Sequence, residues 1–191
     1  KESEKRMASS GEEKTEDNTA TTTAAPSQPE VPALPHFRDG IHSVGTDIEP
    51  GTYRTREASS RCYYSRLSGF EGTIQEIISN DNTNAPAIVT IASTDKGFSS
   101  SHCGTWTQDL SAITASSTSF EDGIFIVGTD INPGTYQSTG GGRCYYARLK
   151  GFGGTVSEII SNDNADGPAI ITISKTDKGF RTSGCGVWTK K

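Results

Sequence analysis

The chain has 191 residues, of which 31% are hydrophobic, and its formal net charge is −5 at pH 7. This length allows one medium domain or two small ones. The net negative charge argues against a nucleic-acid-binding protein, and no apolar run is long enough to cross a membrane as a helix.

The N-terminal segment, residues 1–37, is predicted to be a disordered tether. It mixes runs of charge with a Thr/Ala tract and has few large apolar side chains, so it cannot bury enough surface to offset its ordering entropy. Four prolines (Pro26, Pro29, Pro32 and Pro35) add to its extended character. Because the chain starts at Lys1, we expect that a leader has been removed. A membrane anchor would then be covalent and upstream of this residue.

Three stretches of the remaining chain occur twice. Asp39–Tyr53 recurs as Asp122–Tyr136, Arg61–Asn82 as Arg143–Asn164, and Pro86–Thr107 as Pro168–Thr189. A repeat of about 70 residues is longer than a solenoid repeat and has the size of a small domain. The sequence therefore predicts a tandem duplication, with domains at 38–107 and 120–191 joined by a Ser/Thr-rich linker at 108–119.

Each copy has the sequence pattern of a β domain, because short apolar or alternating runs are separated by Gly, Pro, Asn and Asp. We expect an all-β fold of two small sandwich-like or barrel-like domains. One segment is ambiguous: Thr73–Glu76 has capping-box spacing, and Ile74, Ile77 and Ile78 share a helical face. A short helix or helical turn ending at the sequence SNDN is favoured, and a strand is the alternative.

The decapeptide Val44–Tyr53 recurs at Val127–Tyr136 with one residue changed. Its Pro-Gly pair, Pro50-Gly51 in the first copy, predicts a type II turn with Gly at the second central position. Gly45-Thr46-Asp47 is expected to form a second bend that redirects the chain between strands. In the alternative, Asp47 and Asp130 are paired carboxylates or metal ligands. Turn chemistry explains the sequence more simply, so we interpret the decapeptide as scaffold.

The cysteines form two pairs with equal spacing, Cys62 with Cys103 and Cys144 with Cys185. This spacing predicts one disulfide within each copy, with cross-copy bridges or buried free thiols as the alternatives. A bridge of this length contributes on the order of 4 kcal/mol in the chain-entropy model. Disulfides also indicate a location outside a reducing cytosol.

Strand alternation places Cys62, Tyr64 and Arg66 on one face of their strand, with Tyr63, Ser65 and Leu67 on the other. We expect the second set, together with Trp106, to face the core. The disulfide-bearing face then presents a candidate binding face in each copy, made of Tyr64 and Arg66, and of Tyr146 and Arg148. In the alternative, the two arginines pair with local acids or pack between the copies.

No motif points to catalysis. The three histidines, His36, His42 and His102, have no histidine counterpart in the second copy, so a duplicated active site cannot depend on one. The sequence shows no phosphate loop, dinucleotide fingerprint or EF-hand spacing. We therefore expect no enzymatic activity, no metal site and no cofactor.

The repeated string VGTDIxPGTY, RCYYxRLxGF, TDKGF and CGxWT resembles a domain of exported, often lipid-anchored proteins of actinobacteria. The resemblance covers both copies, Asp39–Thr107 and Asp122–Thr189. It implies a location outside the cytoplasmic membrane and does not imply a catalytic activity. Lys1 stands where a lipidated family member would show its lipobox cysteine.

Together these features predict an extracytoplasmic, non-catalytic binding or accessory module of the cell envelope, with two heads on a flexible tether. Its partner would be an envelope protein or a wall glycan, and two similar heads would give avidity. A structural subunit of an envelope membrane complex is the first alternative. A secreted enzyme inhibitor, with Arg54–Arg61 as its exposed loop, is a weaker one.

Overall fold

The computed structural model of the chain describes residues 34–57 and 59–191. Most of the predicted tether, residues 1–33, lies outside the described residues. The first strand begins at His36, two residues before the expected domain boundary. Phe37 in this strand is 9% exposed and belongs to the core. The following residues, through both repeats to Lys191, belong to one compact unit.

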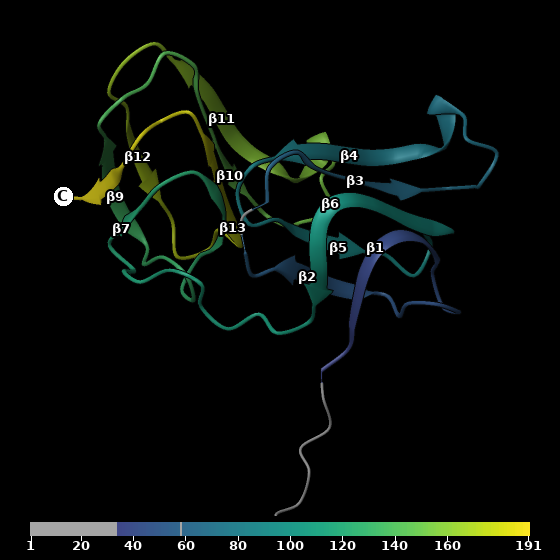
Figure 1. Ribbon diagram of the computed structural model, residues 1–191. Helices are drawn as coiled ribbons and strands as arrows, with labels where there is room; N and C mark the ends of the chain where they lie inside the picture. Colours follow the sequence, from purple (N-terminus) through teal and green to yellow (C-terminus); the bar gives the residue numbers. More distant parts are fainter. Residues whose placement is uncertain (1–33, 58) are drawn as a thin grey trace, which may run out of the picture. The chain divides into compact units, whose positions relative to one another are not determined.

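Repeat 1 is an antiparallel sheet with the strand order β4-β3-β6-β2-β5, in which β1 also pairs with β6 (Figure 1). Its strands are β1 (His36–Ser43), β2 (Gly51–Thr55), β3 (Cys62–Leu67), β4 (Ile77–Thr83), β5 (Ile88–Ile91) and β6 (Gly97–Thr107). β4 and β5 are the edge strands at the two ends of this order, and β1 pairs with β6 alone.

Repeat 2 forms two four-stranded sheets, with the orders β11-β10-β13-β8 and β12-β9-β14-β7. Its strands are β7 (Ser119–Phe120), β8 (Gly123–Ile126), β9 (Gly134–Ser138), β10 (Cys144–Leu149), β11 (Ile159–Ala165), β12 (Ile170–Ile173), β13 (Gly179–Ser183) and β14 (Trp188–Lys190). This is the order of repeat 1 with the two long strands, β1 and β6, each divided in two. The prediction of two tandem β domains is confirmed.

The last long strand of repeat 2 is divided at a backbone bend that repeat 1 shares. Gly184 has φ 68° and Gly186 φ 72°, and the chain leaves the strand conformation between β13 and β14. At the equivalent of Gly184 in repeat 1, His102 also adopts a positive φ, 57°, within the continuous strand β6. A non-glycine residue is uncommon in this region. The change from His102 to Gly184 therefore lies at a backbone bend.

The ambiguous segment is a helical turn for three residues only. η1 (Ile74–Glu76) is a 3₁₀ helix, and the Glu76 carboxylate accepts a hydrogen bond of 3.2 Å from the backbone N–H of Thr73. The expected extent is wrong, because β4 begins at Ile77 and contains the sequence SNDN. η2 (Val156–Glu158) repeats the turn. Among the described residues, no helix has the length and apolar character needed to cross a membrane.

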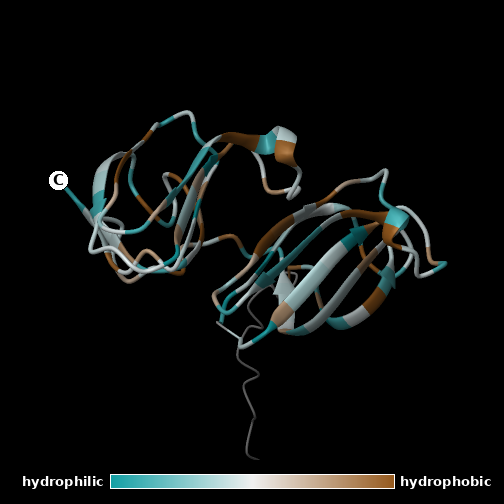
Figure 2. Cartoon of the chain, turned by 90° about the horizontal axis from the view of Figure 1, so that it is seen from above, coloured by the Kyte–Doolittle hydropathy of each residue, from teal (hydrophilic) through white to brown (hydrophobic). Residues whose placement is uncertain are grey.

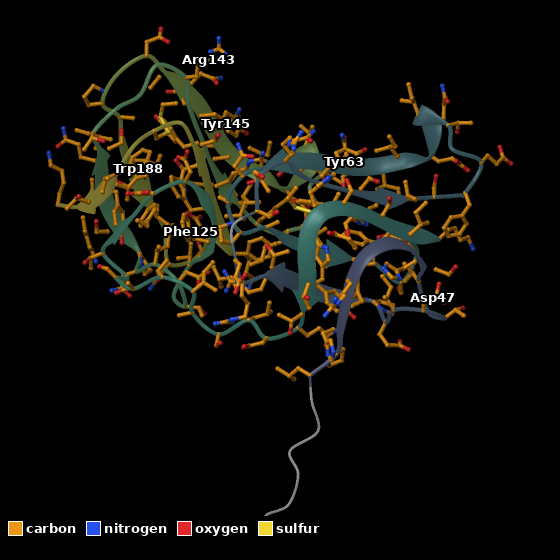
Figure 3. The ribbon with its side chains drawn as sticks, in the orientation of Figure 1. Asp47, Tyr63, Phe125, Arg143, Tyr145 and Trp188 are labelled. Carbon is orange, nitrogen blue, oxygen red and sulfur yellow. A yellow bond between two sulfur atoms is a disulfide. The ribbon has the colours of Figure 1, made fainter. Side chains whose placement is uncertain are left out.

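The core of each repeat is aromatic. Trp106 is completely buried in repeat 1 and packs edge-on against Tyr64 and Phe98. Trp188, labelled in Figure 3, is completely buried in repeat 2, and its indole N–H donates to the Thr182 hydroxyl over 2.8 Å. Figure 2 shows hydrophobic and hydrophilic segments next to one another along the strands, as expected for sheets with one face in the core.

The predicted faces of β3 are reversed. Cys62 and Tyr64 are 1% and 6% exposed and belong to the core with Trp106, whereas Tyr63 and Leu67 are partly exposed. Alternation separates two faces but does not identify the inner one. The disulfide anchors its own face in the core, because Cys103 is also buried there.

Of the two turns expected in the decapeptide, the bend at Gly45–Asp47 is present and the turn at Pro50-Gly51 is not. The predicted type II turn is wrong, because Gly51 has φ 158° and already belongs to β2. The tight turn is at Gly45–Asp47, where Gly45 has φ 81°. The Asp47 carboxylate closes it by accepting a 2.8 Å hydrogen bond from the Ser43 N–H.

Both predicted disulfides are present. Cys62 bonds to Cys103 and Cys144 bonds to Cys185, each across a sequence separation of 41. In both repeats the bridge ties the β3 or β10 strand to the chain around the bend at His102 or Gly184.

Candidate functional site

The residues of the predicted binding face are mostly occupied. Tyr64 and Tyr146 are 6% and 7% exposed and lie in the two cores, so they do not form an exposed surface. The Arg66 guanidinium is held by two hydrogen bonds to Asp95, from Nε over 2.7 Å and from Nη2 over 2.8 Å. Arg148 is held by Asp177 in the same way, over 2.7 and 2.9 Å.

Arg66 also contacts a loop of repeat 2, which is the alternative role of packing between the copies. Its Nη1 donates to the Gly153 carbonyl over 2.7 Å, and the Ser79 hydroxyl donates to the same oxygen over 2.8 Å. The Thr90 N–H donates to the Phe152 carbonyl over 2.8 Å. Ser79 is on β4 and Thr90 is on β5, so the loop of repeat 2 bridges both edge strands of repeat 1.

The surface of repeat 2 that corresponds to the loop-binding surface of repeat 1 is exposed. Ile88 on β5 is 2% exposed, whereas its counterpart Ile170 on β12 is 58% exposed. The side chain of Arg66 is 8% exposed and that of Arg148 is 24% exposed. The two copies therefore differ in exposure at this surface, because the surface of repeat 1 is covered by repeat 2.

A buried ion pair reinforces the contact between the repeats. Arg54 on β2 donates to Asp130 through Nη1 over 3.2 Å and Nη2 over 3.0 Å, and both side chains are completely buried. Asp130 also accepts a 2.7 Å hydrogen bond from the Ile126 N–H, which is the turn-closing role that Asp47 has in repeat 1. Sequence reasoning missed this pair. Its one signal is that repeat 2 has Gln137 where repeat 1 has Arg54.

The first part of the segment considered for an inhibitor loop makes contacts within the chain, whereas Arg61 at its end is exposed. Arg54 is buried, and Arg56 forms an ion pair of 3.0 Å with Asp109 in the linker. Arg56 also donates to the carbonyl oxygens of Ser111 and Ala112. The linker is thus bound to repeat 1 through Arg56.

A polar cleft of about 690 Å³ has lining residues from both repeats. Repeat 1 contributes Arg61, just before β3, and residues 81–86, at the end of β4 and in the β4–β5 connection. Repeat 2 contributes residues 121–124 and 181–183, in and next to β8 and β13. Its charged lining residues are Arg61, Asp81, Glu121, Asp122 and Arg181, and Asn82 and Asn84 add amides. Both signs of charge and several hydrogen-bonding groups therefore meet in one cleft.

The positions of two charged groups in the cleft are fixed by contacts. Arg181 donates to Asp81 over 2.6 Å, and its guanidinium carbon lies 6.0 Å from the centre of the Tyr145 ring. Asp81 also accepts from the Tyr64 hydroxyl over 3.3 Å. Burial raises the pKa of Tyr64 above its ordinary range, and the Asp81 charge adds to this rise. The phenol therefore remains a donor to Asp81.

Arg61 adopts an unusual backbone conformation at the edge of the cleft. Its φ is 64°, and its N–H donates to the Asn84 side-chain oxygen over 2.8 Å. The side chain is exposed. Non-glycine residues in this region cost free energy and occur frequently at binding sites. In repeat 2 the counterpart Arg143, labelled in Figure 3, does not line the cleft.

The comparisons with known proteins agree with this duplicated fold. The Rv1352-like extracellular domain family matches residues 35–107 and again residues 117–189. The uncharacterized protein Rv1352 of Mycobacterium tuberculosis and the uncharacterized protein Mb1387 of Mycobacterium bovis are each 33% identical over 81 residues. The aligned part is 36% of this chain and 66% of each relative, just under two thirds of their length.

No solved structure gives a significant match. Mycobacterial relatives and an extracellular domain confirm the coarser part of the expected resemblance, namely an actinobacterial family of domains outside the cell. The chain belongs to the Rv1352-like extracellular domain family, of which it carries two tandem copies.

Proposed function

We propose that the chain is a non-catalytic binding module of the cell envelope, and that a polar ligand binds in the cleft between its repeats. The cleft is the observation that carries this proposal, because its lining combines cations, carboxylates and amides from both repeats. Such groups bind the hydroxyl groups of a sugar through several directed hydrogen bonds. A wall glycan is therefore the proposed ligand, and an envelope protein segment is the alternative.

The contacts of the acids support binding rather than catalysis. Asp81 already accepts hydrogen bonds from Tyr64, from Arg181 and from the Asn82 N–H. Asp122 accepts a 2.8 Å hydrogen bond from the Gly184 N–H. A general acid or base must exchange its proton with the ligand, and these carboxylates are used to hold the walls of the cleft. Arg61, Asn82 and Glu121 are exposed and are the groups we assign to the ligand.

We also propose that the module is held at the outer side of the cell membrane, by a lipid anchor upstream of Lys1. The family description supports an extracellular position. A ligand in the cell wall would lie within reach of such an anchored module. Labelling the full-length precursor with a fatty acid in the native host tests the anchor separately from the ligand.

The duplication supplies a matched control for ligand binding. Arg61→Ala/Asn82→Ala removes two groups that line the cleft, and Arg143→Ala/Asn164→Ala removes their counterparts, which do not line it. Binding of purified wall polysaccharide fragments would be measured by calorimetry. Loss of two polar contacts should weaken affinity by at least about tenfold, whereas the control pair should leave it unchanged.

Equal affinity for the two double variants would remove the cleft as the glycan site. Failure of the unmodified chain to bind any wall fragment, at concentrations where known glycan-binding modules saturate, would remove the glycan itself. A structural subunit is the second candidate, and the uncovered surface of repeat 2 favours it, because exposed apolar side chains such as Ile170 are suited to a protein contact.

A further inference from the structure

The contact between the repeats joins two different surfaces. Repeat 1 contributes a receiving surface, made of Arg66, Ser79, Ile88 and Thr90, and repeat 2 contributes a docking loop, Gly151–Gly154. When two similar units join through two different surfaces, each unit uses only one of its own two surfaces and keeps the other free. One receiving surface and one docking loop are then left over at opposite repeats.

The unused receiving surface, on repeat 2, is chemically complete. Arg148, Ser161, Ile170 and Thr172 occupy the positions of Arg66, Ser79, Ile88 and Thr90 and have the same residue types. Asp177 holds the Arg148 guanidinium over 2.7 Å, the distance at which Asp95 holds Arg66. Ser161 and Ile170 are exposed, while Ser79 and Ile88 are 8% and 2% exposed.

The unused docking loop, Gly69–Gly72 on repeat 1, has the backbone of the loop that docks. Gly72 has φ 76° and Gly154 has φ 74°. The Glu71 N–H donates to Glu76 over 3.1 Å, as the Gly153 N–H donates to Glu158 over 3.0 Å. Phe70 is 54% exposed. Its carbonyl and that of Glu71 are the counterparts of the two carbonyls through which Phe152 and Gly153 bind.

The edge strands give a physical reason for an occupant. β12 is an edge strand, as β5 is. On β5 the Thr90 N–H finds an acceptor in Phe152, and Thr172 is the counterpart of Thr90 on β12. Edge N–H groups with an exposed apolar neighbour are sites at which another chain pairs.

We propose that the receiving surface of repeat 2 binds the Gly69–Gly72 loop of a second copy of this chain, so that copies associate head to tail. This goes beyond the glycan cleft and uses none of the residues assigned to the ligand. The occupant is a second copy because its loop reproduces the backbone already seated on repeat 1. Successive copies repeat the loop contact that joins the two repeats of one chain, without its two ion pairs. The counterparts of Arg54 and Arg181 are Gln137 and Ser99.

One difference between the loops controls the strength of association. Gly153 corresponds to Glu71, and a Cβ at Gly153 would lie 2.7 Å from Nη1 of Arg66. The Glu71 Cβ would displace Arg148 in the same way when copies meet. Glu71→Gly is therefore expected to tighten association, and Glu71→Arg is expected to abolish it, because like charges would face each other.

Sedimentation velocity over a concentration series tests the proposal, with the full chain and three variants at exposed positions. The unmodified chain should gain mass with concentration, and Glu71→Gly should do so at a concentration lower by about tenfold. Ser161→Arg, which obstructs the receiving surface, and Glu71→Arg, which obstructs the loop, should each stay monomeric. Circular dichroism and tryptophan fluorescence should show that all four fold alike.

A mixture of the two obstructed variants gives the decisive result. Ser161→Arg still has its loop and Glu71→Arg still has its receiving surface, so an equimolar mixture should form dimers and nothing larger. Two results would overturn the proposal: Glu71→Gly remains monomeric at the highest concentration reached, or Ser161→Arg associates as strongly as the unmodified chain. Because glycan binding uses Arg61 and Asn82, calorimetry with wall fragments would be unaffected by either result.

Discussion

Arg54 and Asp130 lie 76 positions apart in the sequence and form a completely buried ion pair between the two repeats. Each carboxylate oxygen of Asp130 accepts a hydrogen bond from one guanidinium nitrogen of Arg54. The same carboxylate closes the turn of its own repeat by accepting from the Ile126 N–H. A residue of the duplicated scaffold has thus gained a second role in one copy. The pair links the repeats through the decapeptide that the two copies share.

Removing one partner of this pair should be strongly destabilising, because the other charge stays buried. Arg54→Gln introduces the residue found at the same position of repeat 2, and we expect the free energy of unfolding to fall by about 3–5 kcal/mol. Urea denaturation measures it. Arg56→Gln is the control, since the Arg56–Asp109 pair is 37% and 39% exposed and such pairs contribute about 1 kcal/mol or less. Equal losses would contradict the assigned importance of Arg54.

The missing side chain at Gly153 lets the docking loop lie close to Arg66. Gly153→Ala places a Cβ 2.7 Å from Nη1 of Arg66 and 2.8 Å from Oε2 of Glu158. We expect a loss of about 1–3 kcal/mol from this overpacking, measured by thermal denaturation. Glu71→Ala, at the uncovered counterpart, should change stability by no more than about 0.5 kcal/mol. A neutral Gly153→Ala would show that the loop does not pack tightly on repeat 1.

Each disulfide should contribute substantially to stability. Cys62→Ser/Cys103→Ser opens a bridge with a sequence separation of 41, and the chain-entropy model gives a loss on the order of 4 kcal/mol. Cys144→Ser/Cys185→Ser should cost a similar amount, because its bridge has the same separation. Chemical denaturation of both variants checks this. Stabilities equal to that of the unmodified chain would contradict a stabilising role of the bridges.

Alkaline pH should unfold the chain. Burial raises the pKa of four tyrosines, Tyr53, Tyr64, Tyr136 and Tyr146. The unfolded tyrosines ionise near their ordinary pKa of about 10, so the unfolded state releases protons that the folded state keeps. The contribution of these tyrosines to stability should therefore be constant below about pH 10 and be lost as the pH rises further. Tyrosinate absorbance and circular dichroism, followed together, should change in one transition; early ionisation of all tyrosines without unfolding would contradict their burial.

The sequence was sufficient for the features that depend on local or repeated patterns. The duplicated cysteines predicted both bridges, and the strand-and-turn pattern predicted an all-β fold. The face of β3 was predicted wrongly, since alternation does not tell which side is buried and Ser65 on the other side is itself only 3% exposed. The SNDN sequence looked like a turn because its residues favour turns, but pairing with β3 holds it as a strand.

The contact between the repeats could not be read from either copy alone. Arg66 and Ser79 are identical in type to Arg148 and Ser161, yet only the first pair receives a loop. The available signal lies in the differences, because Arg54 becomes Gln137 and Glu71 becomes Gly153. At both positions the residue of one copy contacts the other repeat and its counterpart is of a different type. Differences between the copies, and not their shared residues, therefore indicate the interface.

Amide hydrogen exchange at Thr90 and Thr172 tests most directly the claim that one receiving surface is covered and the other is open. The Thr90 N–H donates to Phe152 over 2.8 Å, and Thr172 is its counterpart on the uncovered edge strand. In a dilute sample, where copies stay apart, nuclear magnetic resonance should show slow exchange at Thr90 and fast exchange at Thr172. Equal exchange rates at the two amides would contradict the account.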